Sequence, residues 1–359
     1  MKNVRKLVLA SFVLALIFSV APAVLSQDGI ETVCLVTDTG QIDDGTFNQY
    51  AHEGATAVVE DYDLEYTYIE TQATTDYEAN ISTCVDEGFD VIITVGFLIG
   101  DATWEAAVAN PDVYFIGVDQ FVGDRTDDAG NVTEEAPANF VGIQFREDQA
   151  GFLAGALAAL MTESDVVAGV YGVEIPPVKK FRNGFEQGAL YINPDITLLG
   201  VYIDDFVAPD RGASAAEQFI GEGADVIFGA GGQTGSGGIV AAAQQDIYVI
   251  GVDQDEYVTT FGEGETPGAE YIISSAMKRV DQGVYDMVAA LAEGDMDGFP
   301  GGGVYVMDAA LGGIGLAEPH DADVPEEVLA QVEELFTMLA DGDIDSGVDP
   351  ITGDLLESE

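Results

Sequence analysis

The sequence predicts an α/β protein with two doubly wound lobes, each built on a parallel sheet. The main evidence is an internal repeat: Asp112–Gln120 returns 134 residues later as Asp246–Gln254, with seven of the nine residues identical. A second matching pair, Asp90–Ile93 and Asp225–Phe228, precedes the two copies by 22 and 21 residues. Strand-like runs also alternate with helix-like stretches, as they do in βαβ units. A strand pattern that occurs twice at matching spacing indicates two lobes of equivalent fold.

Short runs rich in β-branched and aromatic residues mark the strands of both lobes. In the first lobe they are Thr32–Thr37, Leu64–Glu70, Val91–Val95 and Val113–Val118. In the second lobe they are Val167–Tyr171, Thr197–Tyr202, Asp225–Gly229 and Tyr248–Val252. The other expected elements are strands at Asn139–Phe145, Tyr271–Ser274 and Gly301–Met307, and helices at Phe47–Glu60, Asp148–Met161, Met277–Ala292 and Pro325–Ala340. The segment Gly123–Pro137 is polar and without periodicity, so it is expected to be a surface loop.

The first 26 residues have the features of a secretory signal. Lys2, Arg5 and Lys6 precede an apolar run over Leu7–Leu25, and the run ends at small residues such as Ser26, where a signal peptide is cleaved. The alternative is an uncleaved anchor helix, because the run approaches the length that spans a bilayer. No cysteine follows the segment directly, so lipid attachment at the cleavage site is not expected.

The remaining chain is long enough for two domains of ordinary size. The N-terminal lobe is expected to comprise residues 27–143 and 276–300, and the C-terminal lobe residues 144–275 and 301–359. The chain would then cross between the lobes about three times. Several crossings make a hinge rather than a flexible linker.

The chain is strongly acidic. Without Lys2, Arg5 and Lys6, 8 Lys plus Arg face 65 Asp plus Glu, a formal charge of −57. Such a field repels nucleic acid, anionic lipid and phosphorylated ligands, and it offers no basic patch for them. A neutral or cationic ligand is therefore favoured. Because the acids are scattered rather than grouped, they are read as a solvated acidic surface and not as an interaction tail.

Cys34 and Cys84 are the only cysteines, and export would permit a disulfide between them. The alternative is two buried thiols that pack as small hydrophobic side chains. His52 and His320 are the only histidines, so a Cys/His zinc site is not expected. No other metal and no cofactor is predicted.

Each copy of the repeat ends on Asp-Gln, which places Asp119 and Asp253 at the carboxyl ends of buried parallel strands. Ligands of open α/β sheets bind at these ends. If the two lobes are equivalent, the two carboxylates face each other across a cleft. The repeat therefore predicts a binding site between the lobes.

The loop after the first strand, Thr37–Gln49, is the most polar segment of the chain and leads into a helix. Asp44 or Thr46 could cap that helix, but capping does not account for Phe47. An aromatic side chain at the rim of a sheet suits stacking on a flat ligand. The alternative for Phe47 is a core-facing position in the first turn of the helix.

Glycines are concentrated in Gly229–Gly238, which follows a strand and opens a helix as phosphate loops do. The segment contains no lysine, and Thr234 stands where the dinucleotide fingerprint has its third glycine. The glycines are therefore expected to let backbone N–H groups approach a ligand that carries no phosphate.

Lysines are scarce enough for their positions to be informative. After the signal only Lys179, Lys180 and Lys278 remain. Lys278 follows a strand expected at a crossing, so it should lie at the floor of the cleft beside Asp119 and Asp253. A Lys–Asp pair there would present a donor and an acceptor to ligand hydroxyls. The alternative is a surface cation that relieves local acidity.

These motifs resemble the basic membrane protein family, the PnrA-like substrate-binding proteins of ABC transporters. The matching segments run in family order from about Thr32 to Gly315 and are Val36–Gln49, Ile175–Phe185, Gly229–Gly235, Gly251–Gln254 and Ser275–Lys278. The resemblance implies a type I periplasmic-binding-protein architecture that closes around a purine nucleoside and delivers it to a membrane permease. Family members commonly carry a lipid-bearing cysteine, which does not stand at the expected position here.

Matched position by position, the family implies distinct roles for the two ends of the ligand. Phe47 and Phe181 would stack on the two faces of the base, and Asn48 and Asp119 would form hydrogen bonds with its edge. Asp253 and Lys278, with the backbone at Gly231 and Gly232, would bind the ribose hydroxyls. Asp38 would shape the first loop. The two aspartates of the repeat would then bind chemically different parts of one ligand.

The expected function is ligand binding for import, without catalysis, by a monomer in the periplasm or on the outer face of the cell membrane. An alternative is a nucleoside hydrolase that uses the acids at positions 38, 43, 44, 119 and 253. No nucleophile motif, no histidine near the loops and no metal spacing accompanies these acids. A third possibility is a sensory module for another small neutral solute, such as a sugar.

Overall fold

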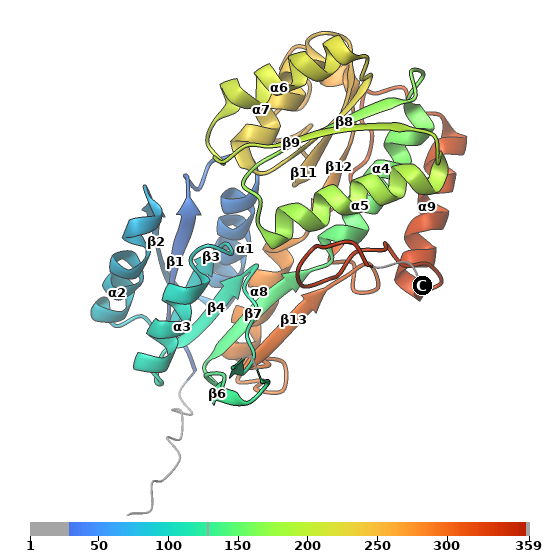
Figure 1. The fold of residues 1–359 in the computed structure, drawn as a ribbon. Coiled ribbons are helices and arrows are strands. Elements are labelled where there is room, and N and C mark those ends of the chain that lie inside the picture. Colours follow the sequence, from blue (N-terminus) through green and yellow to red (C-terminus); the bar gives the residue numbers. More distant parts are fainter. Residues whose placement is uncertain (1–28, 128, 357–359) are drawn as a thin grey trace, which may run out of the picture.

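The computed structural model describes residues 29–127 and 129–356. They form two α/β lobes, one with helices α1 to α3 and one with α4 to α7 and α9 (Figure 1). The predicted signal, residues 1–26, lies outside the described residues. Within the described ranges, no helix combines the length and apolar character needed to cross a membrane.

The N-terminal lobe contains a six-stranded sheet in the order β13-β7-β4-β3-β1-β2, and every strand pair is parallel. Its strands are β1 (Thr32–Thr39), β2 (Glu65–Thr71), β3 (Val91–Val95), β4 (Tyr114–Val118), β7 (Phe140–Phe145) and β13 (Gly303–Met307). Its helices are α1 (Phe47–Tyr62) and α8 (Val280–Glu293) on one face, and α2 (Tyr77–Glu87) and α3 (Gly100–Ala109) on the other. Helices cover both faces, so the central strand β3 is buried throughout and apolar at nearly every position.

The C-terminal lobe repeats this plan with a six-stranded sheet in the order β14-β12-β11-β10-β8-β9, parallel except for β14. Its strands are β8 (Val166–Tyr171), β9 (Thr197–Tyr202), β10 (Val226–Ala230), β11 (Tyr248–Asp253), β12 (Ile272–Lys278) and β14 (Ile314–Leu316). Its helices are α4 (Glu147–Met161), α5 (Pro176–Ile192) and α9 (Glu326–Asp341) on one face, and α6 (Pro209–Glu222) and α7 (Gly232–Ala243) on the other. The predicted architecture of two doubly wound lobes is confirmed.

The assignment of segments to the lobes differs from expectation at β13 and at the end of β12. Residues Gly303–Met307 were expected in the C-terminal lobe, but they pair in parallel with β7 in the N-terminal sheet. Without β13, the apolar strand β7 would be an open sheet edge, and such edges are normally covered. The short spacing between α8 and β13 makes this return to the N-terminal lobe possible.

The strand before α8 is longer than expected. It was predicted over Tyr271–Ser274, but β12 continues to Lys278 because Ser274–Met277 pair in register with β11. Residues 276–278, expected in the N-terminal lobe, therefore belong to the C-terminal sheet, and the helix begins at Val280 rather than Met277.

The segment Gly123–Pro137 contains a small hairpin, where only a loop was expected. Strands β5 (Arg125–Thr126) and β6 (Val132–Glu134) pair antiparallel. The Asp127 carboxylate accepts hydrogen bonds from the backbone N–H groups of Ala129 and Asn131 and so builds the turn.

Three connections in the described chain pass between the two sheets: β7 to α4, β12 to α8, and β13 to β14. The expected hinge of three crossings is confirmed. At the first two crossings an arginine donates two hydrogen bonds to the carboxylate of the aspartate two residues later. The distances are 2.8 Å from Arg146 to Asp148 and 2.9 Å from Arg279 to Asp281. The hinge thus repeats the same motif in both copies.

Cys34 in β1 and Cys84 in α2 form a disulfide, which links two residues that are 50 positions apart in the sequence. Both residues are fully buried among apolar side chains between α2 and the sheet. A cross-link over a loop of this length restricts the unfolded chain, which stabilises the folded one.

We expect the double variant Cys34→Ala/Cys84→Ala to lose about 2–4 kcal/mol of unfolding free energy, because its unfolded state regains the entropy of the open loop. Urea unfolding followed by circular dichroism measures the change. The parent protein unfolded in the presence of reductant is the control, because it lacks the disulfide but keeps both cysteine side chains. Equal transition midpoints for the parent and the variant would contradict the expectation.

Candidate functional site

A cavity of about 670 Å³, partly open to solvent, lies between the lobes at the carboxyl ends of their strands. This space includes solvent at the mouth of the cleft. The structure brings all nine predicted ligand-binding residues to its wall: Asp38, Phe47, Asn48, Asp119, Phe181, Gly231, Gly232, Asp253 and Lys278. In the described part of the chain, no group of His, Cys, Asp and Glu is arranged to hold a metal ion.

The first loop owes its shape to Asp44. Its carboxylate accepts hydrogen bonds from the backbone N–H groups of Thr46, Asn48 and Gln49 at 2.9 to 3.1 Å. Asp44 therefore satisfies the free donors at the start of α1, whereas the Thr46 side chain makes no capping bond. Burial raises the pKa of Asp44, and these donors oppose the rise.

Asn48 connects Asp44 to the end of β1. Its side-chain oxygen accepts a hydrogen bond from the Asp38 N–H at 3.0 Å, and its amide nitrogen donates to Asp44 at 3.0 Å. An amide nitrogen carries two hydrogens, so Asn48 keeps one donor for a ligand. Asp38 accepts a hydrogen bond from the Tyr77 hydroxyl, and burial raises the pKa of Asp38. The Asp38 backbone thus contacts the first loop through Asn48, and its carboxylate contacts Tyr77 of α2.

The two aromatic residues reach the cavity from equivalent helices. Phe47 is the first residue of α1 and is half-buried. Phe181 belongs to the buried stripe of α5, at helical spacing from Val178 and Phe185, and is only 3% exposed. The Lys278 ammonium lies 4.9 Å from the centre of the Phe47 ring and 5.9 Å from that of Phe181. Both rings therefore flank the same point on the cavity wall.

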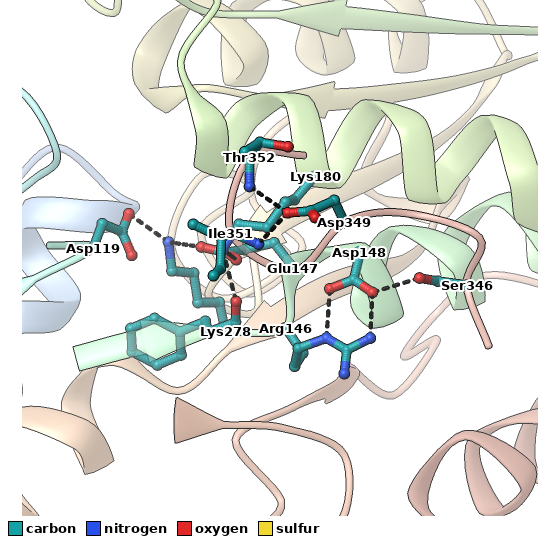
Figure 2. A network of polar contacts seen from close by, with 11 residues as sticks. Asp119, Arg146, Glu147, Asp148, Lys180, Lys278, Ser346, Asp349, Ile351 and Thr352 are labelled. Carbon is teal, nitrogen blue, oxygen red and sulfur yellow. Dashed lines mark hydrogen bonds and ion pairs between the residues drawn. The ribbon is translucent and has the colours of Figure 1, made fainter. Parts of the chain in front are cut away.

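Lys278 is buried at the floor of the cleft, as predicted, and is not a surface cation. Its Nζ lies 2.7 Å from Asp119 Oδ2 and 2.9 Å from Glu147 Oε1 (Figure 2). Burial alone would lower the pKa of Lys278, but these carboxylates raise it above its ordinary value. The ammonium donates a hydrogen bond to Asp119, and its contact with Glu147 is an ion pair. Since an ammonium has three N–H donors, one directed at each carboxylate leaves one for a ligand.

Asp119 has a second oxygen that remains available. Its Oδ1 is buried and has no hydrogen-bond partner among the described residues. Burial raises the pKa of Asp119 to about 6, although Lys278 opposes the rise. Buried polar atoms are normally satisfied, so the free Oδ1 beside the cavity indicates an acceptor for a ligand donor.

Asp253 occupies the same backbone conformation as Asp119, with φ of 63° against 62°. The Lys278 ammonium pairs with Asp119 and Glu147, and in the described residues no ion-pair partner is found for Asp253. Burial raises the pKa of Asp253 to about 7. Lys278 was expected beside both aspartates of the repeat, and the structure shows that it pairs with Asp119 rather than with Asp253.

The glycine segment forms the start of α7. Gly231 has φ of 127°, and a Cβ there would lie 2.4 Å from the backbone nitrogen of Gly172, so only glycine fits. Gly231, Gly232 and Gln233 line the cavity. The backbone N–H groups of a first helical turn lack helical partners and can donate to a ligand oxygen.

Several further residues of the cavity wall were not predicted. Phe97 follows β3, and Phe206 and Val207 follow β9. Phe97 stands two residues after its strand, so a search for aromatic residues at strand ends could have found it, whereas Phe206 and Val207 lie farther along the loop after β9. The apolar residues Ile175, Pro177 and Val178 at the start of α5 complete that side.

The lobes touch each other beside the cavity. The Gln254 amide donates to the Thr46 carbonyl at 2.8 Å, and the Thr259 hydroxyl donates to the Gly45 carbonyl at 2.7 Å. Gln120, the repeat counterpart of Gln254, instead bonds within its own lobe to Thr94. The structure therefore corresponds to a closed arrangement, with the C-terminal lobe held against the start of α1.

Comparisons with known proteins give a consistent result. The CD4+ T-cell-stimulating antigen of Listeria monocytogenes is 33% identical over 330 residues, covering 87% of each chain. The ABC transporter nucleoside-binding protein BmpA of Lactococcus lactis is 27% identical over 323 residues, covering 86% of this chain and 87% of that one.

A solved ABC transporter solute-binding protein from Aeropyrum pernix has a TM-score of 0.73 at 23% identity, and the match covers 88% of this chain and 92% of that one. This similarity supports the fold. The profile of the family described as "ABC transporter substrate-binding protein PnrA-like" matches residues 31–335. The chain therefore belongs to the PnrA-like family of ABC transporter substrate-binding proteins.

Proposed function

We propose that this protein binds a purine nucleoside in the cavity between its lobes and delivers it to an ABC permease, without catalysis. The observation that carries the proposal is the placement of two phenylalanine rings around a buried Lys–Asp pair in a closed cleft. Aromatic faces suit a flat heterocycle, and the Lys–Asp pair offers one donor and one acceptor. The name of the Lactococcus relative supports a nucleoside.

The base lies between Phe47 and Phe181 in this proposal. The Oδ1 atom of Asp119 accepts from its edge, and the remaining amide hydrogen of Asn48 donates to it. The free donor of Lys278 is directed to an oxygen of the ligand at the junction of base and sugar. Each of these three groups has a hydrogen-bonding position that the described protein residues do not use: an acceptor on Asp119, and a donor on Asn48 and on Lys278.

The ribose lies toward the C-terminal lobe. Asp253 accepts hydrogen bonds from its hydroxyls, and the N–H groups at Gly231 and Gly232 donate to them. When the cleft closes, the carboxylate loses its hydrogen bonds to water, and bonds from two neighbouring hydroxyls take their place. This role accounts for a buried carboxylate that the described protein residues leave without an ion-pair partner.

The charge of the cavity favours a neutral ligand. The carboxylates of Asp38, Asp44, Asp119 and Asp253 line it, against the single ammonium of Lys278 among the described lining residues. A phosphate group would be repelled by this excess of negative charge. A nucleoside is therefore favoured over a nucleotide. We further propose that the protein acts as an exported monomer at the outer side of the plasma membrane.

A thermal-shift screen tests this function, because a ligand that binds only the folded state raises the unfolding midpoint. We expect inosine, guanosine or adenosine to raise it, and the corresponding 5′-monophosphates, sugars and amino acids to leave it unchanged. A response to sugars but not to nucleosides would refute the base-stacking site. Release of free base from inosine or adenosine during incubation, followed by chromatography, would refute binding without catalysis.

Truncation of either end of the site should weaken binding. We expect Phe47→Ala and Asp253→Ala each to reduce nucleoside affinity by more than about tenfold, through lost stacking and lost hydrogen bonds to hydroxyls. Isothermal titration calorimetry measures the change, and circular dichroism verifies the fold. Tyr191→Ala, which removes an exposed aromatic side chain outside the cavity wall, is the control. Unchanged affinity in either variant would remove that residue from the site.

The raised pKa of Asp253 has a consequence for stability. Between the ordinary value of 3.8 and about 7 the folded protein retains a proton that the unfolded chain has lost, so stability falls as pH rises through this window. We expect Asp253→Asn to be more stable than the parent at pH 8, by up to about 4 kcal/mol, and similar to it at pH 4. Chemical unfolding at both pH values measures this.

The buried Glu256, whose pKa burial also raises to about 7, provides the comparison for that experiment. It does not line the cavity. Glu256→Gln should therefore remove its own part of the pH dependence without the loss of nucleoside affinity that accompanies Asp253→Asn. A parent and an Asp253→Asn variant with the same pH profile would contradict the assignment.

A further inference from the structure

The internal repeat extends to the hinge. Phe145–Gln149 reads Phe-Arg-Glu-Asp-Gln at the first crossing, and Lys278–Gln282 reads Lys-Arg-Val-Asp-Gln at the second. The shared arginine and aspartate make the same two-bond contact in both copies. The two copies differ at two positions: Phe145 corresponds to Lys278, and Glu147 corresponds to Val280.

At the two differing positions each copy carries one charged residue, Glu147 in the first and Lys278 in the second, and these two residues meet. Lys278 Nζ lies 2.9 Å from Glu147 Oε1 and 5.0 Å from the centre of the Phe145 ring. The other oxygen of Glu147 lies 2.5 Å from Lys180 Nζ, which also donates to the Phe145 carbonyl at 2.9 Å. Figure 2 shows the resulting chain of charges, which runs from Asp119 through Lys278 and Glu147 to Lys180.

This chain is buried, although packing alone does not require charge at these positions. Glu147 and its counterpart Val280 are both 0% exposed, so the same place in the repeat accepts an apolar side chain. Buried ion pairs often contribute less stability than hydrophobic residues of similar volume. A purely structural role would be served as well by the apolar residue of the other copy, so the charge indicates a different role.

We propose that Glu147, which lies outside the cavity wall, is a positioning residue for ligand recognition: it holds the Lys278 ammonium so that its one remaining N–H donor faces the ligand. This inference rests on the proposed function. Asp119 alone would leave the ammonium free to rotate about a single contact. With Glu147 as the second contact, the third donor has a defined direction.

The electrostatics agree with this geometry. Burial alone would raise the pKa of Glu147, but Lys180 and Lys278 lower it below its ordinary value, so the carboxylate stays ionised. Lys180 provides the second positive charge that Glu147 needs once Lys278 is engaged with Asp119. With Asp119 and Glu147 ionised, the four groups together carry no net charge, which lowers the cost of burying them.

The test uses Glu147→Gln, Lys180→Met and the double variant Glu147→Gln/Lys180→Met. The double variant removes one charge of each sign and leaves Asp119 and Lys278 balanced, so it retains a neutral cluster if the single variant fails to fold. We expect inosine affinity to fall about tenfold or more when Glu147 is replaced, with or without Lys180. Lys180→Met alone should keep affinity within about threefold, because Glu147 still holds Lys278. Titration calorimetry and unfolding midpoints are measured for each.

A mutant cycle with Lys278→Met separates positioning from general destabilisation. If Glu147 acts through Lys278, adding Glu147→Gln to Lys278→Met should cost little further affinity, whereas independent effects would add. Additive losses, or unchanged affinity in the double variant that lacks Glu147 and Lys180, would overturn the inference while the parent still binds inosine. A parent chain that binds no nucleoside would overturn the proposed function and this inference together.

Discussion

The buried ammonium of Lys278 joins the two lobes at the floor of the cavity. It ends β12 of one sheet and pairs with Asp119 at the end of β4 in the other, at 2.7 Å, and with Glu147 at the start of α4, at 2.9 Å. Because an unpaired buried charge costs several kcal/mol, these three chain segments must converge on one point. That convergence also places the Phe47 and Phe181 rings within 5.9 Å of the same nitrogen, so the ion pairs and the aromatic walls of the cavity are parts of one arrangement.

The two copies of the repeat share their backbone and differ in their contacts. Asp119 and Asp253 adopt nearly the same left-handed φ, yet only Asp119 is paired with Lys278. Gln120 bonds within its lobe, whereas Gln254 reaches across to the Thr46 carbonyl. Gene duplication would produce a symmetrical cleft, and these differences give it two unequal halves. A ligand with an aromatic end and a hydroxylated end fits such a cleft better than a symmetrical one does.

The internal repeat predicted the two lobes and placed Asp119 and Asp253 at the cleft, because parallel strands bring polar groups at their carboxyl ends to one edge. Most of the other predicted residues of the cavity wall came from the family resemblance of the motifs, and further residues such as Phe97 and Phe206 were missed. The disulfide between Cys34 and Cys84 was left open against two free thiols, since pairing depends on a distance that periodicity does not supply. The placement of β13 was missed because either sheet could have accepted this short strand. The prediction placed Lys278 beside both aspartates of the repeat without choosing its partner. Glu147 was overlooked at the start of an apolar helix, because only three-dimensional contact reveals its pairing with Lys278.

Beside the cavity, and apart from the Lys278 ion pairs at its floor, the lobes are joined by polar contacts that are individually weak. Two hydrogen bonds, from Gln254 and Thr259, join the lobes beside the cavity, and a typical hydrogen bond contributes about 1 kcal/mol net. Both lobes belong to a chain with 65 acidic residues, so their mutual repulsion opposes closure. A ligand that binds the closed form more tightly than an open one shifts the balance toward closure by its differential affinity. Salt screens the repulsion between the lobes, and a ligand forms contacts with both lobes. Both therefore favour the closed form, salt by weakening repulsion and the ligand by adding attraction.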